Sequence, residues 1–367
     1  MMKRGYPSPK LCALLLAVLL LWRMLGAPVT AEQFAQLGAP MRQARALLPA
    51  RLLRVWTLWL PAPAQAPETL LDEAMSADER ALAAMGGEAE PTLAVFLSEE
   101  NRLTTMPLES YVCGVVAAEM PAAYHMEALK AQAVAARTRA LWQAEGGGCS
   151  EHAGADICTH SAHCQGYATI SECQALWGNE YEAYRDRVLA AVQATEGQLL
   201  TYAGKPITVM YHAMSGGVTE DASAVFSQSL PYLVSVSSTG EESARGFYTD
   251  TTVPYEQIAE ALNLPGVDAV EVRQTFSIGE YTPTGRVSTV LIGDEIIQAT
   301  RLRQALGLRS TLFTISMDGE GVTFHQQGYG HGVGMSQVGA NAMAASGSGY
   351  ADILGHYYPG VTLEGVE

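Results

Sequence analysis

The chain has 367 residues, a formal net charge of −16, and a hydrophobic residue content of 48%. A chain of this length and apolar content can bury one large core or two modest ones. Its acidic balance and the lack of a basic stripe argue against nucleic acid as a partner.

The N-terminal residues carry a membrane-targeting pattern. Basic residues precede an apolar run from Leu11 to Trp22, and apolar residues continue past Arg23 to Val29. This charge asymmetry predicts a single-pass signal anchor over residues 1–30, oriented N-in and C-out, if Arg23 snorkels to the interface. A cleaved signal peptide is the alternative, because Val29-Thr30-Ala31 resembles a small-residue cleavage site. Either way, the rest of the chain is expected to work outside the cytoplasm.

Residues 31–90 are interpreted as a juxtamembrane segment followed by an acidic linker. Met41 to Leu60 mixes arginines with leucines and tryptophans, which is typical of an amphipathic segment lying on a membrane. An ordinary helix packed on the main domain is the alternative, although Pro49 makes one continuous helix unfavourable. Glu68 to Glu90 is rich in Pro, Ala and Glu and predicts an exposed linker.

The segment from Pro107 to Trp142 contains a candidate acid. Glu119 closes the apolar run Tyr111 to Ala118, where desolvation can raise a carboxyl pKa toward neutrality, as a general acid needs. The alternative is a carboxylate that satisfies free N–H groups at a helix start. Glu127 fills that role more naturally, because it falls in the first turn of the next helix.

That next helix is predicted from about Met126 to Trp142. The residues expected to face the core are Met126, Leu129, Ala133, Ala136 and Ala140. Arg137 lies beside this face, whereas Arg139 lies opposite it. A guanidinium at the edge of a buried face usually has a carboxylate partner or a ligand. Arg137 and Glu119 are therefore candidates for the same pocket.

A Cys/His-rich insertion follows at about residues 146–175. The order His152-x5-Cys158-x4-His163-Cys164 supplies two thiolates and two imidazoles, a ligand set suited to tetrahedral Zn²⁺. An insertion too polar to form its own core would gain its fold from the metal. Disulfide pairing is the alternative, favoured by an extracytoplasmic location. The cysteines available for two bridges are Cys149, Cys158, Cys164 and Cys173.

The C-terminal half mixes predicted strands and helices. Leu199–Tyr202 and Ile207–His212 predict one hairpin, and Asp318-Gly319 predicts the turn of a second. Arg286–Ile292 is expected to be a strand, followed by a helix over Glu295–Leu306. The fold class expected is α+β, with one large catalytic unit over residues 91–367 that contains the Cys/His insertion.

A loop with alternating glycines runs from Gly328 to Gly334 around His331. It is not a P-loop, because no Gly-Lys-Ser/Thr follows. Alternate glycines let a backbone approach a ligand or another backbone closely. His331 is either a second titrating group or a hydrogen-bonding partner of the loop. Ser336 is the predicted N-cap of the helix that follows.

Four blocks, in order, resemble the stage II sporulation protein D family and its amidase-enhancer relatives. They are Pro107–Trp142, Tyr211–Phe226 with PYLVSV after it, Gly328–Ala344 and Ile353–Gly360. The resemblance covers about Leu93 to the C-terminus. It departs at Arg139, where the family usually has an aromatic residue, and at Ser237–Gly240. Both departures lie away from the motif carboxylate, so they bear on substrate contacts more than on the family itself.

The resemblance implies a peptidoglycan lytic transglycosylase acting on glycan strands whose stem peptides have been removed. Glu119 would be its acid/base at the MurNAc–GlcNAc bond, leaving 1,6-anhydro-MurNAc ends. On residue pattern alone, Tyr211 shares a strand face with Ile207 and Val209 and would be buried. The resemblance instead places it in the substrate groove. The candidate substrate-binding residues are Arg137, Tyr211, His331, Tyr357 and Tyr358.

The resemblance also bears on the metal and the partners. Some clostridial-type members bind zinc through a His, Cys, His, Cys set that matches His152, Cys158, His163 and Cys164, as a structural site. The implied setting is the engulfing membrane of a sporulating cell, beside a membrane-anchored amidase. Two other classes stay open: a non-catalytic cell-wall binder that enhances a partner amidase, and a zinc-dependent peptidoglycan hydrolase.

Overall fold

The computed structural model describes residues 91–226 and 228–365. These residues belong to a compact unit that spans Met75–Glu367. The predicted anchor, juxtamembrane segment and linker lie outside the described residues. Within the described ranges, no helix is both long and apolar enough to cross a membrane. Helices and strands are mixed along the chain, so the predicted α+β class is confirmed.

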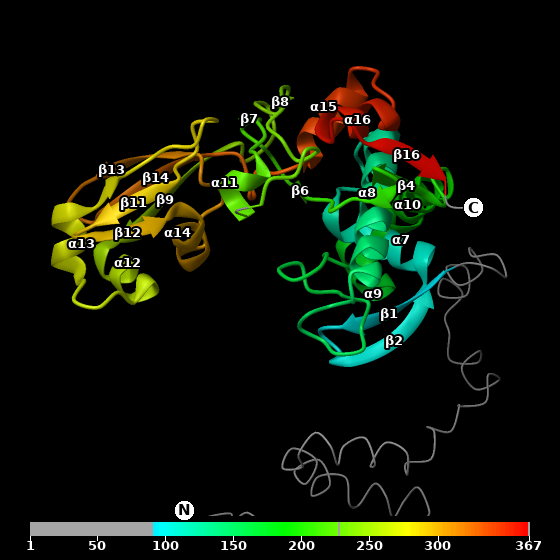
Figure 1. Ribbon diagram of the computed structural model, residues 1–367, viewed down its shortest axis with the longest axis horizontal. Helices are drawn as coiled ribbons and strands as arrows, with labels where there is room; N and C mark the ends of the chain where they lie inside the picture. The colour runs from blue at the N-terminus through cyan, green and yellow to red at the C-terminus, as the bar shows by residue number, and fades with distance from the viewer. Residues whose placement is uncertain (1–90, 227, 366–367) are drawn as a thin grey trace, which may run out of the picture. The chain divides into compact units, whose positions relative to one another are not determined.

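Helix α8 (Met126–Glu145) is the centre of the larger core (Figure 1). Helices α7 (Leu108–Glu119) and α10 (Tyr181–Gln193) pack against it. Helices α15 (Gln337–Ala345) and α16 (Tyr350–Tyr357), far away in the sequence, also pack against α8. The predicted helix is confirmed, but it is buried on more sides than one core face. Small alanine side chains permit this, because they let neighbouring elements approach the helix closely.

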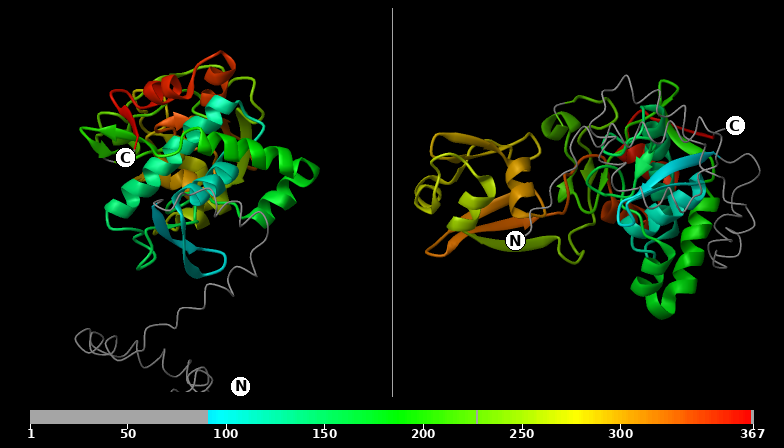
Figure 2. Two further views of the ribbon diagram at one scale, coloured as in Figure 1. Left: turned by 90° about the vertical axis from the view of Figure 1, so that its right-hand side faces the viewer. Right: turned by 90° about the horizontal axis from the view of Figure 1, so that it is seen from below.

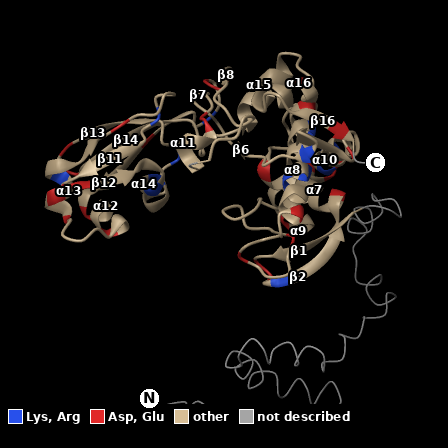
Figure 3. Cartoon of the chain, viewed as in Figure 1, with Lys and Arg blue, Asp and Glu red and all other residues tan. Residues whose placement is uncertain are grey.

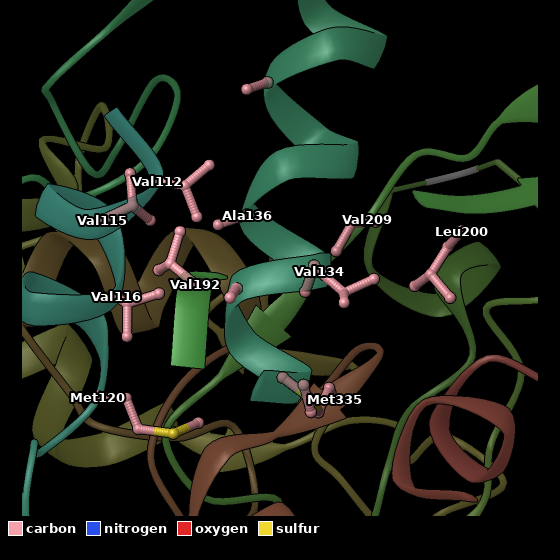
Figure 4. Close-up of a cluster of buried hydrophobic side chains, with 14 of the residues drawn as sticks. Val112, Val115, Val116, Met120, Val134, Ala136, Val192, Leu200, Val209 and Met335 are labelled. Atoms are coloured by element: carbon pink, nitrogen blue, oxygen red, sulfur yellow. The ribbon is translucent and has the colours of Figure 1, made fainter. Parts of the chain in front are cut away.

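Branched and sulfur-containing side chains fill the space between these helices (Figure 4). Val112, Val115 and Val116 of α7 are fully buried, as is Val134 of α8. Completing the cluster are Met120, Ala136, Val192, Leu200, Val209 and Met335. Each fully buried valine contributes roughly 1.5–3 kcal/mol relative to an exposed one. The packing holds α7, and with it Glu119 at its end, in a fixed position.

Small sheets border the larger core. Strands β1 (Thr92–Leu97) and β2 (Arg102–Pro107) form an antiparallel hairpin, and β3 (Ile157–Cys158) of the Cys/His insertion pairs in parallel with β1. Strand β4 (Gln198–Tyr202) pairs with β5 (Lys205–Pro206) as the predicted hairpin. This second strand lies before the expected one, and of Ile207–His212 only Tyr211–His212 is a strand, paired with Met335–Ser336 and not with β4. Strand β16 (Thr362–Gly365) pairs on the other edge of β4.

The tyrosine-histidine motif and the glycine-rich loop meet in a short parallel pair. Strand β6 (Tyr211–His212) pairs with β15 (Met335–Ser336). Gly334 has a φ of +70°, and a Cβ there would collide with the Met210 carbonyl, so glycine is required for this approach. Ser336 Oγ accepts a hydrogen bond of 3.1 Å from the Gly339 N–H, which confirms the predicted N-cap of α15.

A second core lies within residues 248–327 (yellow to orange in Figures 1 and 2). Strand β14 (Gly321–Gln327) lies between β13 (Phe313–Met317) and β9 (Tyr248–Pro254). The predicted hairpin at Asp318-Gly319 is confirmed by the β13–β14 pairing. Phe313 and Phe324 meet edge to face at 5.2 Å between ring centroids.

The helix expected over Glu295–Leu306 is a strand in its first part and a helix only in its second part. Strand β12 (Glu295–Gln298) comes first and pairs with β11 (Thr289–Ile292), and helix α14 (Ala299–Leu306) follows. Ile297 is buried opposite Val290, whereas Ile296 is exposed. That two-residue alternation favours a strand over a helix turn. The other short elements are α9 (Ile170–Trp177), a 3-10 turn (Gly178–Glu180), β7 (Gly217–Val218), α11 (Ala222–Phe226), β8 (Ser237–Ser238), α12 (Tyr255–Leu262), α13 (Ala269–Thr275) and β10 (Ser277–Ile278).

Buried polar groups tie the segment after β6 to the second core. Glu220 accepts a hydrogen bond of 2.6 Å from the Thr282 hydroxyl. Arg286 is buried and donates to the Ser310 hydroxyl at 3.1 Å and to the Ser215 carbonyl. These hydrogen bonds offset part of the cost of burying the two charged groups, although Arg286 Nε has no partner among the described residues.

Candidate active site

Glu119 is the last residue of α7, and its side chain is half-buried. Its Oε1 accepts a hydrogen bond of 2.7 Å from the Gly166 N–H. Burial raises the pKa of this carboxyl, against the lowering effects of the Gly166 N–H, the Gln337 side chain and the Arg139 charge. Glu119 lies at the C-terminal, negative end of the α7 dipole, which also raises its pKa. A carboxyl that keeps its proton to higher pH is suited to general acid chemistry.

Gly166 allows the backbone to reach the acid. A Cβ at position 166 would lie 2.8 Å from Glu119 Oε1, closer than side-chain carbons come to carboxylate oxygens. Only glycine therefore permits this hydrogen bond without movement of the acid. Gly166 was not among the residues predicted from the sequence. Its signal was a lone glycine just after Cys164-Gln165, at the end of the Cys/His insertion.

Tyr211 belongs to a hydrogen-bonded chain next to this contact. Its hydroxyl donates to Gln165 Oε1 at 2.9 Å. Gln165 Nε2 in turn donates to the Ala136 carbonyl at 3.3 Å and to the Tyr111 hydroxyl at 3.4 Å. Burial, followed by the charge of Glu119, raises the pKa of Tyr211 well above its usual value. Tyr211 thus stays protonated near Glu119, and its contact with a sugar stays a prediction.

The structure corrects the placement of Arg137. Its side chain is completely buried, and Nε and Nη2 each donate to one Glu109 carboxylate oxygen at 2.6 Å. Nη1 donates to the Gln198 carbonyl at 3.2 Å. Of the two partners considered from the sequence, Arg137 has the carboxylate and not a ligand. Its contact with a substrate stays a prediction.

Arg139 is the arginine near the acid. Its half-buried side chain donates from Nε to the Cys164 carbonyl at 3.1 Å and from Nη1 to the Val209 carbonyl at 2.9 Å. Its charge lowers the pKa of Glu119. Helical spacing correctly placed Arg139 away from the core face but could not show that the insertion covers that side of α8. The departure from the family's usual aromatic residue is thus near the motif carboxylate in space.

His331 lies beside Tyr211 in the glycine-rich loop. Its Nδ1 accepts a hydrogen bond of 3.0 Å from the Val333 N–H. Burial, followed by the charges of nearby arginines, lowers its pKa to about 4. His331 is therefore neutral at pH 7 and offers hydrogen bonds, not a positive charge. Of the two roles considered from the sequence, this geometry supports the hydrogen-bonding one.

The two C-terminal tyrosines are buried packing residues in this structure, which corrects their expected exposure to a sugar. Tyr357 is 1% exposed, and its hydroxyl lies 2.7 Å from the Ser238 hydroxyl. Tyr358 is 0% exposed, and its hydroxyl donates to the Met210 carbonyl at 2.7 Å. Tyr358 instead supports the strand that carries Tyr211.

A cluster suited to a metal ion lies in the Cys/His insertion. Ligand atoms of Cys149, His152 and Cys158 lie within 4.8 Å of one another. Cys164 Sγ lies 3.7 Å from Cys149 Sγ. Two thiolates on a tetrahedral zinc ion are separated by about 3.8 Å, given Zn–S bonds of about 2.3 Å. The ligand atoms of Cys149, His152 and Cys158 are therefore close enough together to hold a metal ion, and the Cys164 thiol lies next to this cluster.

His163 is not part of this cluster, which corrects the predicted ligand set. Its side chain is exposed, and its ring lies 6.2 Å from that of His152. Cys149 lies in the cluster instead. The set of cysteines considered for two disulfides is not gathered either, because Cys173 packs with Ala117 and Tyr181 in a separate small cluster.

A separate cleft of about 700 Å³ lies between β2, α7, α9 and α10. Its wall includes Gly114, Tyr167 and Trp177, and none of the predicted site residues lines it. Tyr167 stacks on Tyr111 with ring centroids 5.7 Å apart. Tyr167 thus separates the cleft from the hydrogen-bonded chain near Glu119.

Comparison with known proteins assigns the chain to a family. The family model described as "Stage II sporulation protein" matches residues 98–202, which contain Glu119, Arg139 and the Cys/His cluster. A stage II sporulation protein D of Bacillus amyloliquefaciens is 36% identical over 284 residues, covering 75% of this chain and 81% of that protein. The chain belongs to the stage II sporulation protein D family.

Two further relatives define the range of the family. A stage II sporulation protein D of Bacillus subtilis is 34% identical over 274 residues, covering 74% of this chain and 78% of that protein. The amidase enhancer of Bacillus subtilis is 28% identical over 301 residues, covering 68% of this chain and 40% of that protein. The family thus joins sporulation proteins with a protein named for its effect on an amidase.

Proposed function

We propose that this protein is a peptidoglycan lytic transglycosylase. It cleaves the MurNAc–GlcNAc bond of denuded glycan strands during engulfment in sporulation. The observation that carries the proposal is the half-buried Glu119 carboxyl with its raised pKa. Besides burial, the groups that shift this pKa are the Gly166 N–H, the Gln337 side chain and the Arg139 charge. Most glycosidases require a pair of carboxyl groups, whereas a lytic transglycosylase requires one acid/base.

Glu119 carries both proton transfers in this reaction. As a carboxylic acid, it donates its proton to the glycosidic oxygen while the bond from MurNAc C1 to that oxygen breaks. GlcNAc leaves as the alcohol. The carboxylate then accepts the proton of the MurNAc C6 hydroxyl while O6 bonds to C1, which closes the 1,6-anhydro ring. Glu119 is again protonated at the end, and no water is consumed.

The neighbours of Glu119 hold it for these steps. The Gly166 N–H fixes one carboxylate oxygen, and the Gln337 side chain also bonds the carboxylate. These donors stabilise the carboxylate formed after the first transfer. Tyr211 and the neutral His331 offer hydrogen bonds to sugar hydroxyls on the side of β6 and the glycine-rich loop.

A zinc ion in the Cys/His insertion has a structural role in this proposal. Cys149, His152, Cys158 and Cys164 provide four ligands, and a closed set leaves no position for a metal-bound hydroxide. The ion would neutralise the thiolates and hold the insertion, including the segment that leads to Gly166. The residues fit zinc because the ligand atoms of Cys149, His152 and Cys158 lie within 4.8 Å of one another and Cys164 Sγ lies 3.7 Å from Cys149 Sγ.

The cellular setting follows from the N-terminal pattern and the family. We infer a single-pass signal anchor over residues 1–30 and a juxtamembrane segment with an acidic linker over 31–90. The catalytic domain over 91–367 lies on the extracytoplasmic side. The charge asymmetry around Leu11 to Val29 supports this orientation. The partner is a membrane-anchored amidase that removes stem peptides, and the amidase-enhancer relative supports work at the cell wall.

The test uses the full chain on purified denuded glycan strands. Glu119→Gln should abolish cleavage while the protein stays folded, because an amide is nearly isosteric but cannot donate and recover a proton. The matched control is Glu145→Gln, at the exposed end of α8, which should cleave at the wild-type rate. Substantial cleavage by folded Glu119→Gln protein would remove this residue from the mechanism.

Product chemistry separates a transglycosylase from a hydrolase. Mass spectrometry should find 1,6-anhydromuramyl ends and no oxygen from heavy-oxygen water. Labelled reducing ends would instead make the protein a hydrolase. Loss of cleavage on chelation with the fold unchanged would favour the zinc-dependent class.

The relative named an amidase enhancer supports a second candidate function. In that case the protein binds the cell wall and stimulates a partner amidase without cleaving glycan. Stimulation that survives in Glu119→Gln, together with no glycan cleavage by the wild type, would favour this function over the first.

A further inference from the structure

Arg139 has a donor group that the protein itself does not use. Nε and Nη1 bond the carbonyls of Cys164 and Val209, and Nη1 also lies 3.7 Å from the Met210 sulfur. Among the described residues, Nη2 has no hydrogen-bond acceptor, and the side chain is only half-buried. The two carbonyls therefore fix the plane of the guanidinium and leave its Nη2 group available to a ligand.

The two segments that hold Arg139 are those that build the site. Cys164 lies two residues before Gly166, which bonds Glu119, and Val209 lies two residues before Tyr211. The positive charge of Arg139 acts on Glu119, Tyr211 and His331. The guanidinium thus lies among the groups that would surround a bound sugar.

The other basic groups of α8 are already paired. Arg137 is buried against Glu109, and the Lys130 ammonium lies 2.7 Å from Glu127. The chain as a whole carries a net charge of −16, and Figure 3 shows acidic residues spread over the described elements. An anionic ligand is repelled by such a protein unless a local cation offsets the repulsion. Arg139 provides that cation beside the acid.

We propose that Arg139 binds the free lactyl carboxylate of a muramic acid residue in the glycan and selects strands whose stem peptides have been removed. This inference rests on the proposed function and adds the residue that determines specificity. Muramic acid has one carboxyl group, and an attached stem peptide turns it into an uncharged amide. Peptide removal restores the anion. A guanidinium is the side chain best matched to a carboxylate, through charge-assisted hydrogen bonds.

The test compares two substrates that differ only at this group. One is denuded glycan with free lactyl carboxylates, and the other is the same glycan after conversion of those carboxylates to methylamides. The full-length wild type should cleave the first with a kcat/KM about tenfold higher, equivalent to ~1.4 kcal/mol. In Arg139→Gln the ratio should fall toward one, through loss on the carboxylate glycan. Arg139→Lys should keep part of the preference, because it keeps the charge.

Controls separate specificity from folding. Arg273→Gln, an exposed arginine on α13, should keep the wild-type ratio. Because both substrates are compared on one preparation, a partly unfolded variant changes both rates equally and leaves the ratio intact. An Arg139→Gln ratio equal to that of the wild type, or an equal fall on both substrates, would show a purely structural arginine and overturn the proposal.

A binding measurement keeps this test separate from the proposed function. If the wild type cleaves neither glycan, the transglycosylase proposal fails, and binding of the two glycans to the wild type and to Arg139→Gln is measured instead. A carboxylate preference that depends on Arg139 would uphold the inference without catalysis. Equal binding of the two glycans by the wild type would refute it.

Discussion

The buried pair of Arg137 and Glu109 gives a sharp test of what α8 contributes. Replacing Arg137 with Met removes a guanidinium that is completely buried and bonds both carboxylate oxygens of Glu109 at 2.6 Å. It leaves Glu109 as a buried charge without this partner. Breaking a buried pair in this way costs about 3–5 kcal/mol.

The predicted loss is large enough to measure by thermal unfolding. In a domain of about 150–250 residues, each kcal/mol shifts Tm by about 2–4 °C, so Arg137→Met should lower Tm by roughly 10 °C. Replacing both residues, as Arg137→Met with Glu109→Leu, should cost less than Arg137→Met alone, because no charge is left buried. Calorimetry of the three variants, with glycan cleavage measured well below each Tm, gives the comparison.

The outcome decides between a structural and a substrate-binding arginine. If the pair is structural, cleavage per folded molecule stays close to wild type in the double variant. An unchanged Tm in Arg137→Met together with a large loss of cleavage would refute the reasoning. It would return Arg137 to the substrate-binding role expected from the sequence.

Three further predictions follow from the site. Gly166→Ala should lower cleavage by about tenfold or more and lower Tm by several degrees, because its Cβ would lie 2.8 Å from Glu119 Oε1 and a hydrogen bond to a charged group contributes about 1.5–3 kcal/mol. Product yield and calorimetry check the two parts. Cys149→Ser should lose most of its bound zinc, whereas His163→Ala should keep about one ion per chain, as measured by elemental analysis of the purified proteins. Burial raises the pKa of Glu119 in the folded protein. The contribution of this carboxyl to the free energy of unfolding is therefore complete below its unfolded pKa of about 4.3. That contribution is lost as the pH rises through the folded pKa. Glu119→Gln should therefore gain stability relative to wild type between pH 4 and 7, and a gain that is independent of pH would contradict the assignment of burial as the cause.

The sequence predicted correctly those elements whose formation depends on neighbouring residues. The helix after Pro121, the hairpin at Asp318-Gly319 and the Ser336 cap each depend on residues close together in the sequence, and each is present. Glu119 was predicted as the acid because the end of an apolar run next to a proline is a local signal for desolvation. Its raised pKa agrees with that signal.

The errors have a common physical cause, which is that local spacing does not show contacts between segments distant in the sequence. Helical spacing put Arg137 near the core face and Arg139 away from it, and this is correct for α8 alone. Spacing could not show that Glu109 would meet Arg137, nor that the carbonyl of Cys164 would meet Arg139. The choice of His163 over Cys149 as a ligand failed for the same reason. Ligand order in the sequence does not specify which side chains a loop turns inward.

The segment from Cys164 to Gly166 joins the features that the sequence analysis treated separately. Cys164 contributes its thiol to the metal cluster and its carbonyl to Arg139. Gln165 accepts from Tyr211, and Gly166 donates to Glu119. A displacement of this segment would therefore move the donor to the acid, the partner of Tyr211 and one support of Arg139 together. If a metal ion holds Cys164, as proposed, it would fix the geometry of the acid's own hydrogen bond, and it would affect the proposed glycan cleavage without taking part in the proton transfers.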